Sequence, residues 1–282
     1  MRNALTIDVE DWYHAHDLGI EPEQRDGLED RVEYGTDVFL ELLARHNTRG
    51  TFFILGEVAC RHPNLVKRIA AAGHEIGSHG SRHTLIYRQT RTEFQADLLS
   101  SKQILEDLTG KEVRIYRAPS WSISPDTLWV LQILEEEGFI CDSSIQPFRT
   151  PLSGMKGAPV VPFHPVINGK RLNLIEFPPT VLEIGRCRVP FAGGLYLRLL
   201  PFSFIAKALA RVNKQRPGLV YAHPWETDME QPRLKVSVLT RITHYYNLRS
   251  TRTKLARLIR NFSFSPLGDL IKSGDYPAYP VG

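Results

Sequence analysis

Cysteine is scarce in this chain, and long apolar runs are missing. The three cysteines, Cys60, Cys141 and Cys187, are an odd number without the paired spacing of a disulfide framework or a thiolate metal cluster. We therefore interpret them as core residues of a protein in a reducing compartment. The longest apolar runs, such as 50–55 and 69–72, are far shorter than the roughly 20 residues that cross a bilayer. We expect no transmembrane helix.

Signals for export and for nucleic-acid binding are also missing. The N-terminus has no apolar stretch followed by a small-residue cleavage site, so we expect no signal peptide and a cytoplasmic location. A net charge of +4 is too small to indicate nucleic-acid binding. The sequence has no glycine-rich phosphate loop, no zinc-finger spacing and no interleaving of aromatic and basic residues. We therefore expect neither DNA nor RNA as a partner.

Strand and helix patterns alternate along the chain. Short apolar runs typical of buried strands occur at 3–8, 51–55, 74–78, 113–117, 139–141 and 218–222. Helical spacing and capping residues occur at 36–46, 65–72, 92–108, 124–138 and 202–212. This alternation is typical of a parallel α/β fold, and the lack of a dinucleotide-binding glycine motif favours a distorted barrel. The proline- and glycine-rich texture of 146–201 predicts β-hairpins inserted near its mouth.

Two histidines four residues apart follow the strand predicted at 74–78. These are His79 and His83, and the first strand ends in acidic residues at 8–11. The carboxyl ends of parallel strands meet at one end of a barrel, so the two groups are expected to lie together. Histidine and carboxylate ligands with one open position are typical of hydrolytic zinc sites. The spacing alone is weak evidence, and two solvated loop histidines are the alternative.

Five polar clusters occur in order at predicted strand ends, and together they resemble the motifs of one enzyme family. The clusters are at 6–11, 78–83, 116–121, 141–144 and 221–224. They resemble the polysaccharide deacetylases of carbohydrate esterase family four, the NodB-homology domain. The first of these clusters opens with Asp-Val-Glu-Asp-Trp at 8–12, and the last ends with His-Pro-Trp-Glu at 223–226. Both resemble the motifs of the branch that includes peptidoglycan deacetylase and allantoinase-like members, and in particular those of deacetylases associated with exopolysaccharide and exosortase genes.

The resemblance implies a fold, a cofactor and a reaction. The fold is a deformed (β/α)7 barrel, the cofactor is a divalent metal ion, most simply zinc, held by two histidines and a carboxylate, and the reaction is hydrolysis of N-acetyl groups on sugars. His79 and His83 match the metal histidines. The remaining matches are Asp8 as general base, His223 as general acid, Arg117 as the arginine that orients the base, and Asp142 as the acid that tunes the catalytic histidine.

One metal ligand and the substrate contacts stay open. Val9 stands where the family has its metal carboxylate; strand alternation favours Glu10 as the third ligand, whereas a turn would present Asp11 instead. A backbone N–H near Ser120 or Trp121 is expected to complete an oxyanion hole. Trp121 and Trp225 are interpreted as sugar-stacking walls, with ordinary packing as the alternative.

The expected substrate is an N-acetylated glycan in bacterial exopolysaccharide or cell-envelope synthesis. Two rival functions share the same motifs. One is allantoinase-like hydrolysis of a small cyclic amide or imide, and the other is a barrel that binds glycans without turnover.

The end of the chain differs in charge. Residues 231–268 include no acidic residue and eight lysines and arginines. We predict a barrel domain over 1–230 and a basic helical extension over 231–282 packed on it, because Leu255, Leu258 and Ile259 recur at helical spacing. A solvated basic face is the simpler interpretation. The alternative is peripheral contact with an anionic partner: a lipid-diphosphate-linked glycan, an acidic polymer or the inner membrane surface.

Overall fold

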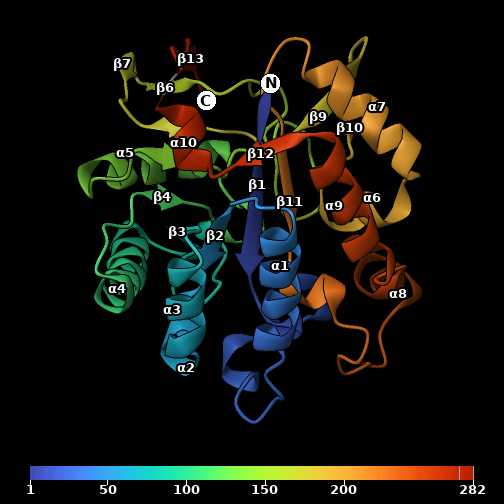
Figure 1. The fold of residues 1–282 in the computed structure, drawn as a ribbon. Helices are drawn as coiled ribbons and strands as arrows, with labels where there is room; N and C mark the ends of the chain where they lie inside the picture. The colour runs from blue at the N-terminus through green and yellow to red at the C-terminus, as the bar shows by residue number, and fades with distance from the viewer. Residues whose placement is uncertain (273, 282) are drawn as a thin grey trace.

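A curved parallel sheet forms the centre of the computed structural model, which describes residues 1–272 and 274–281. Its strands run in the order β11-β1-β2-β3-β4-β5-β8, and β12 also pairs with β1 (Figure 1). Their bounds are β1 (Arg2–Val9), β2 (Thr51–Ile54), β3 (Glu75–Ser78), β4 (Ile115–Tyr116), β5 (Cys141–Asp142), β8 (Ile175–Glu176), β11 (Leu219–Ala222) and β12 (Ser263–Ser265). The predicted deformed α/β barrel is confirmed, as a half-barrel left open between β8 and β11.

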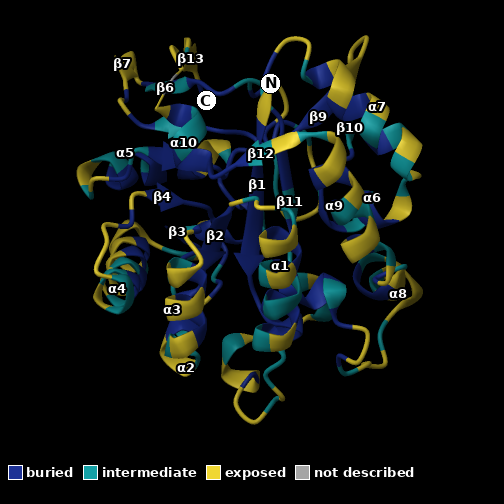
Figure 2. Ribbon diagram, viewed as in Figure 1, coloured by how far each residue is buried: buried dark blue, intermediate teal, exposed yellow. Residues whose placement is uncertain are grey.

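Helices cover the outside of this sheet. They are α1 (Val32–Arg45), α2 (Gly56–Arg61), α3 (Pro63–Ala71), α4 (Arg91–Thr109), α5 (Trp129–Glu136), α6 (Gly194–Leu199), α7 (Phe202–Val212), α8 (Val238–Tyr245), α9 (Ser250–Asn261) and α10 (Leu267–Ile271). Every residue of β1 after Arg2 is buried, as expected for a parallel strand covered on both faces. Figure 2 shows the sheet as the buried centre, with the exposed residues on the outer faces of the helices.

The start of α1 differs from its prediction. We predicted a helix from residue 36, capped by Thr36 and Asp37, but α1 begins at Val32. The reason is that the Asp11 carboxylate accepts hydrogen bonds from the backbone N–H groups of Arg31 (2.6 Å) and Val32 (2.8 Å). The cap therefore comes from a residue twenty positions earlier, which a local sequence pattern cannot reveal.

Hairpins occur in the inserted region, as predicted. The strands β6 (His164–Ile167) and β7 (Lys170–Arg171) pair antiparallel, as do β9 (Val181–Ile184) and β10 (Cys187–Pro190). The apolar run at 171–177, which we expected in a hairpin, instead supplies β8, and this strand joins the main sheet parallel to β5.

The C-terminal segment is helical but also contributes strands. The predicted helix around Leu255, Leu258 and Ile259 is α9, and these three side chains are buried. After α9, β12 pairs in parallel with β1, and β13 (Ala278–Pro280) pairs with β6. Of the helices in the described part of the chain, none has the length and apolar character that a bilayer crossing requires.

The cysteines do not all lie in the core. Cys141 is buried in β5, but Cys60 and Cys187 are exposed. The prediction of core packing is therefore wrong for these two. Cys60 lies near the end of the short helix α2, and Cys187 begins β10, a strand with no buried residue.

Candidate active site

The predicted polar residues gather at the carboxyl ends of neighbouring strands. Asp8 and Glu10 come from the end of β1, His79 follows β3, Arg117 follows β4 and His223 follows β11. A cavity of about 500 Å³ opens at this end of the sheet. Its lining includes the predicted residues Asp8, Glu10, His83, Ser120, Trp121, His223 and Trp225.

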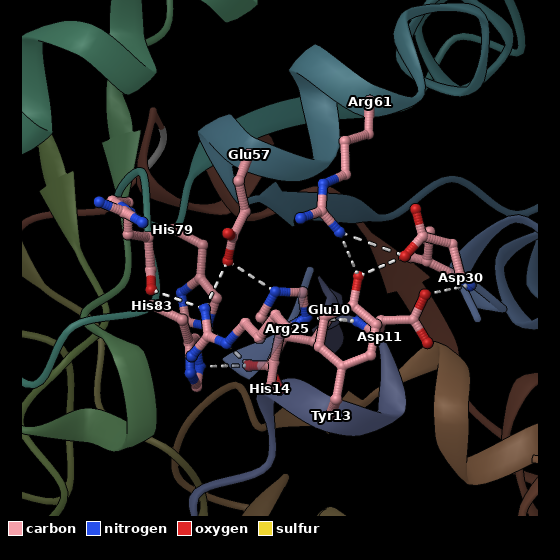
Figure 3. Close-up of polar contacts among 12 residues, drawn as sticks. Glu10, Asp11, Tyr13, His14, Arg25, Asp30, Glu57, Arg61, His79 and His83 are labelled. Atoms are coloured by element: carbon pink, nitrogen blue, oxygen red, sulfur yellow. Dashed lines mark hydrogen bonds and ion pairs between the residues drawn. The ribbon is translucent and has the colours of Figure 1, made fainter. Parts of the chain in front are cut away.

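Glu10, His79 and His83 converge on one point. Oε1 of Glu10 lies 2.9 Å from Nε2 of His79 and 2.9 Å from Nε2 of His83, and all three side chains are buried (Figure 3). Nδ1 of His79 lies 2.7 Å from the carbonyl oxygen of Arg117. A carbonyl only accepts, so this Nδ1 carries the proton, and in the neutral ring Nε2 turns a lone pair toward the carboxylate.

This donor set fits a divalent cation. A lone pair and a carboxylate oxygen repel each other at 2.9 Å unless a positive charge lies between them. Burial lowers the pKa of His83 to about 4 in spite of the neighbouring Glu10, so its ring is neutral, as a metal ligand must be. Burial raises the pKa of Glu10, but the neighbouring histidines outweigh this effect and hold that pKa well below its usual range. Two histidines and a carboxylate are a typical hydrolytic zinc set.

Asp11 lies outside this cluster. Besides capping α1, its carboxylate accepts a hydrogen bond from the backbone N–H of Trp12 at 2.8 Å. Burial raises its pKa to about 6 against the effect of these three bonds. The alternative in which Asp11 is the third ligand is therefore wrong for this structure, because its oxygens are used to begin two helical segments.

Asp8 and Arg117 form a buried ion pair. Nη1 of Arg117 donates to Oδ1 of Asp8 (2.5 Å) and to the Thr6 hydroxyl (2.9 Å). The guanidinium is held further by the carbonyl and the hydroxyl of Ser143, at 3.2 and 3.0 Å. The other oxygen of Asp8 lies 3.8 Å from Nε2 of His223. Arg117 therefore fixes an aspartate whose second oxygen faces the cavity.

His223 is held by a carboxylate that differs from the one expected. Its Nδ1 lies 3.0 Å from Oε2 of Glu226, and Oε1 of Glu226 accepts from Nε of the buried Arg198 at 2.8 Å. Burial lowers the pKa of His223, but Glu10, Glu226 and Asp8 raise it to about 9. Glu226 belongs to the His-Pro-Trp-Glu cluster at 223–226, but no role was predicted for it, although it lies only three residues after His223, in the short turn η7 (Pro224–Thr227) that His223 caps.

Asp142 does not contact His223 in the described structure, so the predicted contact between these two side chains is wrong. Its carboxyl group accepts from the Ser144 hydroxyl and interacts with Glu176, which accepts the backbone N–H of Ile145 at 2.9 Å. Oδ2 of Asp142 and Oε2 of Glu176 are both buried without another partner among the described residues. Burial raises the pKa of both groups, to about 6 for Asp142, so burial favours their protonated forms.

The residues predicted to contact the substrate all line the cavity, and His16 lines it as well. Ser120 and Trp121 adopt φ values of 51° and 52°, a left-handed conformation rare for such residues. The backbone N–H of Trp121 donates to Ala118, so Ser120 is the better candidate of the two for an oxyanion hole. Trp225 stacks on His223 with ring centroids 5.2 Å apart. His16, which the sequence analysis missed, stacks on His83 (4.7 Å) and lies 3.0 Å from the Ser120 hydroxyl.

A polar network supports the His83 side of the cluster. Oε1 of Glu57 lies 2.6 Å from Nε2 of His14 and 2.7 Å from Nη1 of Arg25 (Figure 3). Arg25 also donates to the backbone carbonyl of Arg82, directly before His83. Three separate segments supply these residues, so no spacing in the sequence indicates them.

Comparison with protein families matches two parts of the chain. Residues 26–138 match the polysaccharide deacetylase family, and residues 143–272 match a domain of unknown function (DUF3473). A peptidoglycan-N-acetylglucosamine deacetylase of Bacillus cereus is 37% identical over 93 residues, which are 33% of this chain and 34% of that protein. A protein of the same name from Listeria monocytogenes is 33% identical over 99 residues, 35% of this chain and 20% of that protein. The matched region thus spans about a third of the first relative and a fifth of the second.

Solved structures share the fold. A structure from Mycobacterium smegmatis carrying the polysaccharide deacetylase name superposes with a TM-score of 0.60 at 19% identity, covering 96% of this chain and 88% of that one. A family 4 carbohydrate esterase pseudoenzyme from Bacillus anthracis reaches 0.51 at 14% identity, covering 100% and 69%. Because a pseudoenzyme has this fold, the activity must be argued from the site residues.

Proposed function

This chain belongs to the polysaccharide deacetylases of the NodB type, and on that premise we propose that it hydrolyses the N-acetyl group of a sugar in a polysaccharide or its precursor. One observation carries the proposal. A candidate metal cluster, an arginine-bound aspartate and a carboxylate-bound histidine line the same cavity. These are the groups that amide hydrolysis requires: an electrophile, a base and an acid.

We propose that Glu10, His79 and His83 hold a divalent metal ion, with zinc as the first candidate. Such an ion supplies Lewis acidity for the acetyl carbonyl. The hydrogen bond from Nδ1 of His79 to the Arg117 carbonyl orients that ring, and this is the usual way in which a protein fixes the tautomer of a ligating histidine.

The protein's own groups handle the protons. Asp8, held by Arg117, is placed to take a proton from the attacking water at its free oxygen, Oδ2. His223, with its pKa raised to about 9 by the surrounding carboxylates, is protonated at neutral pH and can donate from Nε2 to the departing amine. Glu226 orients this ring by accepting from Nδ1. An amine expelled without a proton is a very poor leaving group, so this donation is essential.

Acetate release from a panel of N-acetylglucosamine oligomers tests the proposal. We expect release by the zinc-loaded protein and its loss in Asp8→Asn and His79→Ala, with Lys67→Gln on the outer face of α3 as a matched control. Release that persists in both site variants would contradict the assignment. Turnover of allantoin without acetate release would instead indicate a cyclic amide or imide hydrolase, and glycan binding without any turnover would indicate a binding protein.

The physiological substrate that we propose is a bacterial cell-envelope or exopolysaccharide glycan. The support is that the curated relatives are named peptidoglycan deacetylases. A comparison of peptidoglycan fragments with exopolysaccharide oligomers of equal length in the same acetate assay would distinguish the two.

A further inference from the structure

The helix α8 exposes apolar side chains toward solvent. Val238, Leu239 and Ile242 lie on one face at helical spacing, with 70%, 72% and 43% of their surfaces exposed, and Tyr246, directly after the helix, is 45% exposed. The opposite side of the helix carries the buried His244. A surface helix normally turns its apolar face to the core, so the orientation of α8 is the reverse of what folding alone favours. Isolated exposed apolar residues are common, but three on one face of a short helix, with a fourth directly after it, indicate a contact surface.

Basic residues occur in this helix and in the segments directly before and after it. Arg233, Lys235, Arg241 and Arg249 are exposed in and around α8, and no acidic residue occurs between 231 and 268. Within the described residues, none of these four cations forms an ion pair with a carboxylate; Arg233 instead lies over the ring of Tyr245. Apolar side chains flanked by unpaired cations are typical of helices that lie in the interface of an anionic membrane.

The same helix forms the rim of the cavity. Leu239, Thr240 and Thr243 line the cavity that also includes Glu10 and His223. The helix is fixed in place, because Arg198 donates to the carbonyl oxygens of Thr243, His244 and Tyr246 at 2.6 to 3.0 Å. A surface that touched α8 would therefore lie at the mouth of the cavity without rearrangement of the helix.

We propose that α8 docks this protein onto the surface of an anionic phospholipid bilayer, with the mouth of the cavity facing the membrane. The apolar face of α8 inserts among the lipid headgroups, and the surrounding lysine and arginine side chains contact lipid phosphates. If the proposed deacetylase function holds, the glycans that reach the site are those presented at the membrane, and this consequence rests on that function. The proposed docking of α8 does not depend on that function.

Vesicle co-sedimentation of the full chain tests the docking. We expect binding to vesicles of phosphatidylcholine with phosphatidylglycerol, little binding to phosphatidylcholine alone, and weaker binding as salt is raised. Each cation near the surface contributes about fivefold to partitioning, so Lys235→Gln with Arg241→Gln should weaken binding about 25-fold. Val238→Ser with Ile242→Ser should weaken it by a similar or larger factor, because two apolar side chains no longer insert.

Matched variants elsewhere on the surface serve as controls. Lys67→Gln with Lys111→Gln removes two exposed cations from other elements, and Leu99→Ser with Ile184→Ser removes two exposed apolar side chains. These controls should bind vesicles as the unmodified protein does. Acetate release from a soluble oligomer is measured separately and should be unchanged in all four double variants, so failure of the enzyme proposal and failure of docking are distinguishable.

Three results would overturn the proposal. They are the absence of binding to anionic vesicles, equal loss of binding in the control variants, and a concentration-dependent dimer, seen by sedimentation velocity, that Val238→Ser with Ile242→Ser abolishes while vesicles are not bound. The last result would assign the apolar face of α8 to self-association.

Discussion

The carboxylate of Glu226 lies 3.0 Å from Nδ1 of His223, in the role for which Asp142 was expected. The same Oε2 also accepts the backbone N–H of His223 at 3.0 Å, and Arg198 fixes the other oxygen. The orientation and charge of His223 therefore depend on its own turn and on α6, which carries Arg198. Asp142 instead interacts with Glu176.

Glu226→Gln should reduce kcat about 100-fold with little change in KM, because it weakens a general acid without removing a substrate contact. Glu226 helps to raise the pKa of His223 to about 9, and the acid must be protonated to act. Activity should therefore fall as pH rises through about 9 in the unmodified protein. In the variant, this alkaline fall should begin at lower pH, which a pH profile of kcat measures.

Asp142→Asn is the matched control for Glu226→Gln. Asp142 does not contact His223 in the described structure. The alkaline fall in kcat of the Asp142→Asn variant should therefore occur at the same pH as in the unmodified protein. A shift in Asp142→Asn, with none in Glu226→Gln, would show that the catalytic histidine depends on the family's usual carboxylate.

Asp8→Asn should lower stability as well as activity. The variant leaves the guanidinium of Arg117 buried and without its ionic partner, and loss of one member of a buried pair costs about 3–5 kcal/mol. Urea unfolding measures this cost. The double variant Asp8→Asn with Arg117→Met should recover part of it, since no unpaired charge is then buried. Equal stability of Asp8→Asn and the unmodified protein would contradict the ion pair.

The pair of Asp142 and Glu176 predicts a pH-dependent stability. Burial raises the pKa of both groups in the folded state, so the stabilisation from their protons is complete below the unfolded pKa values near 4 and is lost as pH rises through the folded values. Glu176→Gln keeps the hydrogen bond without a titrating proton. The variant should gain about 1 kcal/mol or more relative to the unmodified protein between pH 4.5 and pH 7. Urea unfolding at both pH values checks this; a constant difference would contradict the raised pKa values.

Sequence patterns predicted the parallel strands and most helices because local periodicity determines them. Strands β1, β2 and β11 and helices α4 and α7 lie where apolar spacing and capping residues placed them. The strand ends then brought Asp8, Glu10 and His223 to one cavity, since parallel strands share a carboxyl edge.

What the sequence patterns missed depends on contacts between distant segments. The long-range cap by Asp11 and the network of His14, Arg25 and Glu57 join residues with no fixed spacing. Helix α8 lies within the helical extension predicted over 231–282, but its outward-facing apolar residues could not be predicted, because its orientation depends on the contacts of Arg198 with distant backbone carbonyls.

Metal content distinguishes the two acidic residues that follow β1. Glu10→Gln should reduce the zinc bound per chain at least tenfold after dialysis, since it removes the charged ligand between His79 and His83. Asp11→Asn should retain the metal but lose about 1 kcal/mol of stability, because a neutral amide caps α1 less well than a carboxylate. Elemental analysis and urea unfolding of both variants measure the two effects. Loss of zinc in Asp11→Asn, with full occupancy in Glu10→Gln, would mean that the chain turns after Val9 when metal binds and that Asp11 is the ligand.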